Sequence, residues 1–301
     1  MKLLIVNYHY FREEKYKSGI YPISTKEFQE QLEYLNKKYK LISQLELGNI
    51  MKSKTNYNDN FALITFDDGL SEQMKAYDIM VKNGVPGIFY VTTDPIKNNK
   101  CVDVHKLHYI RSKFDDIEIF NKLSQSYSID KFNFNMNTVQ AQYKYDDELS
   151  QKIKYFINFI LDMKQRRNFV DNMFSSLVEN ENEFSKMLYM SQDDIVKLST
   201  NDMLGTHSAS HQALAGLNDF GIYNDIKSSL DFFKSIGINN IPSISYPYGG
   251  FTAVNDIVIE ISKKFGFHFG LTMFRGVNNF EDILENRMLL KRISCSDLVL
   301  T

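Results

Sequence analysis

Phe61-Ala-Leu-Ile-Thr-Phe-Asp-Asp-Gly69 is a short apolar run that stops abruptly at two adjacent carboxylates and a glycine. A run of this length that is rich in β-branched and aromatic residues predicts a buried strand. Because neighbouring side chains of a strand point to opposite faces, Asp67 and Asp68 can take different roles at the same strand end. The glycine permits a sharp turn, after which residues 71–83 have helical spacing and end at Gly84, a natural C-cap. The stretch therefore predicts a strand, an acidic tip and a helix.

Strands alternate with helices on both sides of this stretch. Residues 3–8 form an apolar run that predicts a first strand, and Ser24-Thr-Lys-Glu27 is a capping box that predicts the start of a helix. Residues 40–43 suggest a second strand, and residues 49–60 are polar enough to predict a loop that contains at most one helical turn. The next strand is expected at residues 85–91, so the order strand, helix, strand indicates a mainly parallel sheet. Further elements are expected after residue 190: strands at 203–206, 243–246, 268–271 and 290–293, and helices at 222–236 and 254–264.

The segment from about residue 96 to residue 186 differs from the rest of the chain. It is charged and rich in asparagine, and its apolar residues recur at helical rather than strand spacing, as in Leu107, Ile110 and Phe114. Matching strand units lie on both sides of this segment. We therefore expect one barrel-like α/β domain over residues 1–301 with a helical insertion at about 96–186, rather than two independent domains.

Composition narrows the classes of function. The 301 residues, 43% of them hydrophobic, are enough to bury a large core. With a formal charge of −2, the chain lacks the excess of basic residues that binding to nucleic acid requires, so we exclude nucleic acid as the main partner. Small molecules and glycans remain as candidate ligands. The two cysteines, Cys101 and Cys295, cannot form a disulfide framework. The chain has neither a membrane-spanning run nor a signal-peptide pattern at Met1, so we expect a cytoplasmic protein.

Two histidines follow another predicted strand. Gly205-Thr-His207-Ser-Ala-Ser-His211 places both at the C-terminal end of the strand at 203–206, which is the end where barrel folds bind ligands. Histidines four residues apart meet on one side of a turn, and two imidazoles with one carboxylate can hold a divalent metal while leaving open positions. Either the histidine pair or the aspartate pair alone is also typical of a polar loop. Their joint occurrence at strand ends favours a metal site.

A third polar element ends the strand at 243–246. In Ser245-Tyr-Pro247-Tyr248-Gly249-Gly250, the proline ring restricts the backbone conformation, and the glycines have no side chain that would keep a ligand away from the backbone. The backbone N–H of Tyr248 could then face a substrate while its ring forms a wall. A plain Pro-Gly turn would explain the same residues equally well.

At these residues the sequence resembles the polysaccharide deacetylase family, which has the NodB-homology fold. The family's first motif, Thr-Phe-Asp-Asp-Gly, is intact at residues 65–69, and its second, His-Ser/Thr-x-x-His, at residues 207–211. The Pro-Tyr-Gly part of its third motif matches residues 247–249. The resemblance covers residues 1 to about 91 and about 190 to the end. It implies a distorted, TIM-like (β/α) barrel that binds a divalent metal, often zinc.

The resemblance also implies roles for the motif residues. Asp68, His207 and His211 would bind the metal, and Asp67 would act as the general base that takes a proton from the attacking water. The backbone N–H of Tyr248 would help to stabilise the oxyanion, and Pro247 and Tyr248 would contact the substrate.

The function expected from these roles is removal of an N-acyl group, with acetyl as the leading choice, from an amino sugar or glycan intermediate. A cytoplasmic location would favour a soluble or lipid-linked intermediate of surface-polysaccharide biosynthesis. The alternative from another class is a non-catalytic protein that binds metal and sugar and derives from the same fold.

The sequence departs from the family pattern in two places, and both departures motivate that alternative. Many members carry an arginine just before Pro-Tyr that helps to orient the base. The corresponding residues of this chain, Ser243-Ile-Ser-Tyr246, include no arginine. The late Leu-x-His motif that supplies the general acid is also not evident, because Leu289-Leu-Lys-Arg-Ile293 contains no histidine. His9, at the tip of the first strand, is our candidate for the general acid. His268 lies at the start of a strand, which is the wrong end.

Overall fold

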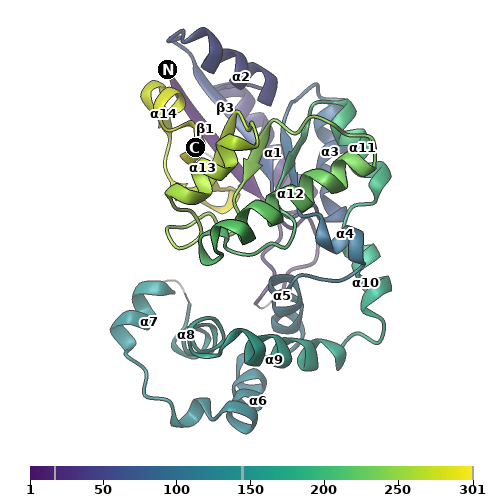
Figure 1. The fold of residues 1–301 in the computed structure, drawn as a ribbon, viewed down its shortest axis with the longest axis vertical. Coiled ribbons are helices and arrows are strands. Elements are labelled where there is room, and N and C mark those ends of the chain that lie inside the picture. Colours follow the sequence, from purple (N-terminus) through teal and green to yellow (C-terminus); the bar gives the residue numbers. More distant parts are fainter. Residues whose placement is uncertain (17, 144–145, 300–301) are drawn as a thin grey trace. The chain divides into compact units, whose positions relative to one another are not determined.

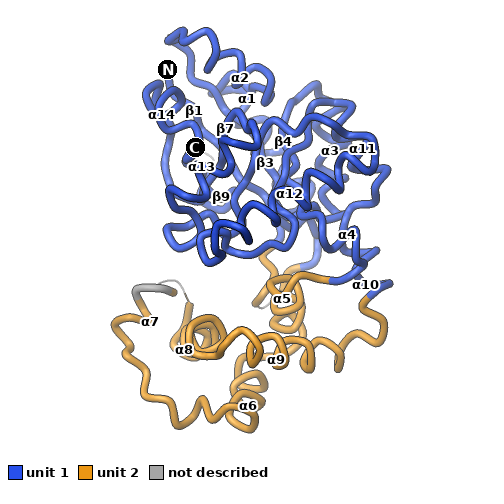
Figure 2. The backbone as a smooth tube through the Cα atoms, viewed as in Figure 1, with its two compact units in different colours: residues 1–14, 22–100, 182–301 blue, residues 15–21, 101–181 orange. Residues whose placement is uncertain are grey.

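The structure is a computed structural model that describes residues 1–16, 18–143 and 146–299. The chain forms two compact units (Figure 2). The barrel unit comprises residues 1–14, 22–100 and 182–301, and the helical unit comprises residues 15–21 and 101–181. The organisation expected from the sequence, one domain with a helical insertion at about 96–186, stays a prediction.

Seven parallel strands form the barrel, and β1 closes it by pairing with both β3 and β9. In ring order the strands are β1 (Lys2–Tyr8), β3 (Asn60–Phe66), β4 (Ile88–Val91), β5 (Leu204–Thr206), β6 (Ser243–Ser245), β7 (Phe269–Arg275) and β9 (Leu290–Ser294). Two short strands extend the sheet: β2 (Lys40–Leu41) runs parallel to β3, and β8 (Asn278–Asn279) runs antiparallel to β1. The predicted distorted (β/α) barrel is confirmed.

Helices surround the strands of the barrel unit (Figure 1). They are α1 (Thr25–Lys38), α2 (Gln44–Ser53), α3 (Met74–Lys82), α4 (Asp94–Asn98), α11 (Gln192–Thr200), α12 (Asp219–Ser235), α13 (Asp256–Lys264) and α14 (Phe280–Glu285). Helix α10 (Glu181–Leu188) joins the helical unit to the barrel unit along the chain. The predicted capping box of α1 is present, because Ser24 accepts a hydrogen bond from the Glu27 backbone and the Glu27 side chain accepts one from the Ser24 backbone. Short 3-10 helices occupy Ser71–Gln73, Ile129–Lys131, Leu214–Gly216, Arg287–Leu289 and Cys295–Asp297.

Helix α2 corrects one expectation. The helical turn expected within residues 49–60 is the end of α2, which begins already at Gln44, and the second strand predicted at residues 40–43 ends at Leu41. Ser43 instead caps the helix through a second capping box with Glu46. The helix is stabilised by its buried apolar side chains, which include Leu47, Ile50 and Met51 and share one core cluster with side chains of the barrel strands.

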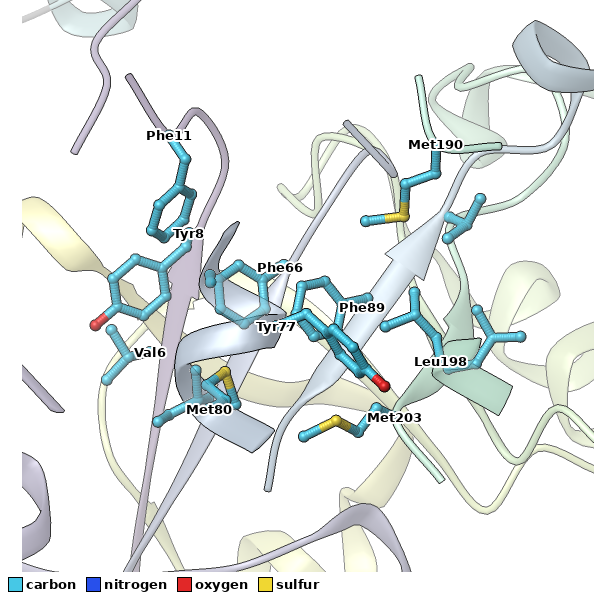
Figure 3. Close-up of a cluster of buried hydrophobic side chains, with 14 of the residues drawn as sticks. Val6, Tyr8, Phe11, Phe66, Tyr77, Met80, Phe89, Met190, Leu198 and Met203 are labelled. Carbon is cyan, nitrogen blue, oxygen red and sulfur yellow. The ribbon is translucent and has the colours of Figure 1, made fainter. Parts of the chain in front are cut away.

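An aromatic core cluster fixes the end of β3. Phe66 stacks on Phe89 of β4 with ring centroids 4.2 Å apart, and its other neighbours include Tyr8 and Phe11 (Figure 3). Burial of a phenylalanine side chain stabilises the fold by about 1.5–3 kcal/mol. Because Phe66 packs between the strands and the helices, the alternation along β3 turns Thr65 and the following Asp67 toward the barrel interior.

The helical unit consists of amphipathic helices, as the spacing of its apolar residues predicts. They are α5 (Asp103–Lys113), α6 (Asp116–Tyr127), α7 (Met136–Gln142), α8 (Glu148–Tyr155), which continues as a π-helix over Phe156–Ile160, and α9 (Met163–Ser175). Leu107 and Ile110 are buried on α5. Lys106 pairs with Asp171 and Glu181 at 2.7 and 2.9 Å, which joins α5 to α9 and to the end of the unit. No helix of the described residues is long and apolar enough to cross a lipid bilayer.

Candidate active site

The predicted site residues follow the C-terminal ends of three barrel strands. Asp67 and Asp68 follow β3, His207 follows β5, and Pro247 lies two residues beyond β6. Because the barrel strands are parallel, these ends meet at one mouth of the barrel. The structure therefore brings together residues that are about 180 positions apart in the sequence.

Asp68, His207 and His211 form a compact set that could hold a metal ion. All three side chains are buried, and their ligand atoms lie within 4.8 Å of one another. The Nε2 atoms of His207 and His211 lie 3.4 and 3.1 Å from Oδ1 of Asp68. Zinc bonds of about 2.1 Å at the tetrahedral angle place two ligand atoms about 3.4 Å apart. The donor types and their separations therefore fit a divalent ion such as zinc.

The loop that carries the two histidines is held from two sides. His207 Nδ1 lies 2.7 Å from the carbonyl oxygen of Ser245, and a hydrogen bond donated there leaves Nε2 directed at Asp68. The carboxylate of Asp225, on α12, accepts a hydrogen bond from the backbone N–H of Ala209 at 2.9 Å and another from the hydroxyl of Ser210. These bonds fix the position of the loop before any ligand binds.

Strained backbone is concentrated at this site. Asp68, Ser208, His211 and Tyr248 have φ angles of 82°, 61°, 57° and 62°, which lie in the left-handed region that disfavours residues other than glycine. The described residues contain eight such non-glycine positions, so half of them lie here. Each costs about 1–2 kcal/mol, and strain of this kind typically persists where function requires it.

Asp67 is held by a buried arginine from the opposite end of the chain. Arg292, in β9, donates to the two carboxylate oxygens at 2.9 and 2.7 Å, and Nδ2 of Asn7 donates to Oδ2 at 3.0 Å. Arg292 is completely buried, and it also donates to the Thr272 carbonyl and the Ser245 hydroxyl, each at 2.9 Å, and to the Thr65 hydroxyl at 3.3 Å. The guanidinium is thus fixed by three strands, and it fixes the carboxylate.

These contacts set the charge of the site. Burial alone would raise the pKa of Asp67, but the charge of Arg292 and then that of His207 outweigh burial and lower the pKa to about 2. Burial alone would lower the pKa of His207, but Asp67 and Asp68 raise it above its usual value. Asp67 is therefore ionised at neutral pH. A carboxyl group with so low a pKa holds a proton only briefly and must pass it on quickly.

Arg292 corrects an expectation drawn from the sequence. The base does have an arginine partner, which comes from β9 rather than from the residues before Pro247. The available signal was an arginine between the apolar residues of a short predicted strand, in the stretch Leu289-Leu-Lys-Arg-Ile293. Asn7 was also missed, although it is the polar residue within the apolar first strand.

The candidate general acid, His9, follows β1 at the same mouth. Gln73 Nε2 donates to the backbone carbonyls of both His9 and Asp67, at 2.9 and 2.6 Å, so the two segments are tied together. The charge of a protonated His9 favours the ionised form of Asp67 and contributes to its lowered pKa. His268 directly precedes β7, at the opposite end of the barrel.

The third motif forms part of the rim. The Tyr248 ring is half-exposed, and its centroid lies 5.1 Å from that of His211, whereas Pro247 is buried. Gly249 has a φ of 57°, and a Cβ atom there would lie only 2.5 Å from the backbone nitrogen of Met273. Glycine is therefore required at this point, where the loop after β6 touches the end of β7.

Comparisons with known proteins bear on the family and on the fold. A family model described as polysaccharide deacetylase matches residues 177–270. No curated protein sequence gives a match. The structure is similar to that of the Streptococcus pyogenes deacetylase PplD in complex with acetate, with a TM-score of 0.61 and 14% identity over 98% of this chain and 92% of that one.

Two further solved structures share the fold. IcaB from Ammonifex degensii has a TM-score of 0.58 and 15% identity, over 97% of this chain and 91% of its own. The BpsB deacetylase domain from Bordetella bronchiseptica has a TM-score of 0.55 and 14% identity, over 97% and 95%. The family model and the shared fold confirm the resemblance to the polysaccharide deacetylase family that the motifs indicate.

Proposed function

We propose that this chain is a metal-dependent carbohydrate N-deacetylase, an amide hydrolase that removes an N-acyl group from an amino sugar or glycan intermediate. The observation that carries the proposal is the buried set Asp68, His207 and His211 beside Asp67, whose carboxylate is clamped by Arg292. We propose acetyl as the acyl group, which accords with the acetate bound to the similar S. pyogenes deacetylase. We further propose a cytoplasmic role in surface-polysaccharide biosynthesis.

The metal that we propose is zinc, held by Asp68, His207 and His211. When bound, it would polarise the amide carbonyl and make water a better nucleophile. Two imidazoles and one carboxylate leave at least one coordination position open, as a catalytic site requires.

The remaining chemistry falls to groups of the chain. Asp67 is ionised and fixed in orientation, so it is suited to take the proton of the attacking water. The Tyr248 backbone N–H, presented by a left-handed turn, would donate to the oxyanion that forms as water attacks the carbonyl. The C–N bond then breaks, and the leaving amine needs a proton, for which we propose His9 as the donor.

The non-catalytic metal- and sugar-binding protein remains the second candidate, because residues 289–293 lack the histidine of the late motif. Its other motivation, an unpartnered base, no longer holds, since Arg292 pairs with Asp67 at 2.7 Å. The hydrolase is therefore the better supported of the two.

Asp67→Asn distinguishes the two candidates. The assay is acetate release from a panel of N-acetylated sugars, nucleotide sugars and oligosaccharides by zinc-loaded protein, together with zinc content per chain. For a hydrolase we expect turnover to fall by at least about 100-fold while zinc content is unchanged. Asp59→Asn, an exposed substitution ahead of β3, is the matched control and should have no effect. Absence of acetate release by the unmodified protein on the whole panel would contradict the proposal.

A further inference from the structure

An exposed aromatic patch extends outward from the candidate metal site. It consists of the exposed residues Tyr248 and Phe251 and the half-buried Phe274. Phe251 is 86% exposed, more than any other large apolar side chain of the described residues. Its ring stacks on that of Phe274, with centroids 4.3 Å apart and planes inclined by 26°. This pair leaves most of the Phe251 ring in water, so packing within the fold does not account for it.

Two contacts connect the patch to the candidate metal site. The Tyr248 ring packs edge-on against the metal-site residue His211. The backbone N–H of Met273, next to Phe274, donates to the Gly249 carbonyl at 2.9 Å, so the loop of Tyr248 and Phe251 is fixed against the end of β7. The rings therefore stand on two adjacent and mutually bonded segments of the barrel mouth.

We propose that this aromatic patch is a sugar-binding subsite, in which the Phe251 ring stacks on a pyranose ring adjacent to the sugar that is deacetylated. This inference rests on the proposed function. The C–H groups on one face of a pyranose are apolar and match the electron-rich face of an aromatic ring. A subsite beside the reacting sugar implies that the substrate is a chain of at least two sugars, and that a single N-acetylated sugar is a poor substrate.

A lipid surface suits the patch less well. Membrane-binding segments combine apolar side chains with several lysines or arginines, whereas residues 246–253 contain no charged residue and the one arginine next to Phe274, Arg275, pairs with Asp297 at 3.5 Å. Continuity with the ligand-binding end of the barrel also favours a ligand of the same site over a separate partner.

The absence of tryptophan from the chain allows a direct binding test. Phe251→Trp introduces a single indole fluorophore at an exposed position where it should not disturb folding. Tyr57→Trp is the matched control, because Tyr57 is also exposed, contacts Phe61 at the start of β3 and thus lies at the opposite end of the barrel. The ligands are N-acetylglucosamine and its tetramers in β-1,4 and β-1,6 linkage, and lipid vesicles with anionic headgroups serve as the competing probe.

We expect saturable change of the Phe251→Trp emission with a tetramer and none with the Tyr57→Trp protein. In parallel, Phe251→Ala should reduce kcat/KM for the tetramer about tenfold more than for the monosaccharide, which corresponds to about 1.4 kcal/mol. The subsite proposal would be wrong if the Phe251→Trp emission did not change with either tetramer, or changed only with vesicles. Emission that responds to a tetramer without any acetate release would support the subsite while contradicting the proposed hydrolase.

Discussion

Replacement of Arg292 by methionine tests how the candidate base is held. The substitution preserves much of the side-chain volume but removes both hydrogen bonds to the Asp67 carboxylate. In the intact protein the pKa of Asp67 is lowered from 3.8 to about 2, which corresponds to about 2.4 kcal/mol of stability at neutral pH. Loss of one partner of a buried ion pair costs about 3–5 kcal/mol, so we expect the free energy of unfolding at pH 7 to fall by about 3 kcal/mol.

The stability difference between Arg292→Met and the intact protein should depend on pH in a defined direction. Because the folded pKa of Asp67 lies below 3.8, its stabilising contribution is complete above pH 3.8 and is lost as the pH falls through about 2. In Arg292→Met, the effect of burial on Asp67 is opposed only by the weaker influence of His207 and His9, so the pKa of Asp67 rises above its value in the intact protein. The stability deficit of the variant should then be largest near neutral pH and shrink toward pH 4, and the acid limb of its kcat/KM profile should move to higher pH.

Urea unfolding at pH 7 and pH 4.5, combined with a pH profile of acetate release, measures these effects. Arg287→Met is the matched control, since Arg287 is exposed and lies five residues earlier; it should change the free energy of unfolding by less than about 0.5 kcal/mol. The reasoning would be refuted if Arg292→Met lost less than about 1 kcal/mol at pH 7 and kept the acid limb of the intact protein.

Three further substitutions probe the metal loop and the candidate acid. His211→Ala should abolish tight zinc binding, measured as zinc content per chain after dialysis; unchanged content would rule out the proposed ligand set. Asp225→Ala removes the acceptor that holds Ala209 and Ser210, and should weaken zinc affinity about 10–100-fold, whereas Asp231→Ala on the same helix should not. His9→Ala should lower kcat and remove the basic limb of the pH profile if His9 protonates the leaving amine; an unchanged profile would exclude it.

The parts of the site that the sequence revealed are those in which neighbouring residues carry the signal. Asp67 and Asp68 directly end an apolar run, and His207 and His211 directly follow another, so strand ends and residue type sufficed to place them. The mainly parallel direction of the strands also followed from the local alternation of strands and helices. The strand-end inferences each use fewer than about ten consecutive residues, and the parallel sheet follows from one strand–helix–strand stretch of about thirty.

Arg292 shows where sequence reasoning stops. It lies 225 positions after Asp67 and reaches it only because β9 pairs with β1, which in turn pairs with β3. No local pattern contains that register. The start of helix α2 was missed because the capping residue Ser43 was assigned to a strand that in fact ends at Leu41. A charged residue at a position that faces the barrel interior is the clue that should direct attention to such a partner.

Zinc-dependent release of acetate tests the central proposal most directly. The protein would be stripped of metal with a chelator, dialysed, and titrated with zinc while zinc content and acetate release from N-acetylglucosamine tetramers are followed together. We expect both to be absent in the stripped protein and to rise in parallel until about one zinc is bound per chain. A protein that binds one zinc through Asp68, His207 and His211 but releases no acetate from any N-acylated sugar would contradict the account.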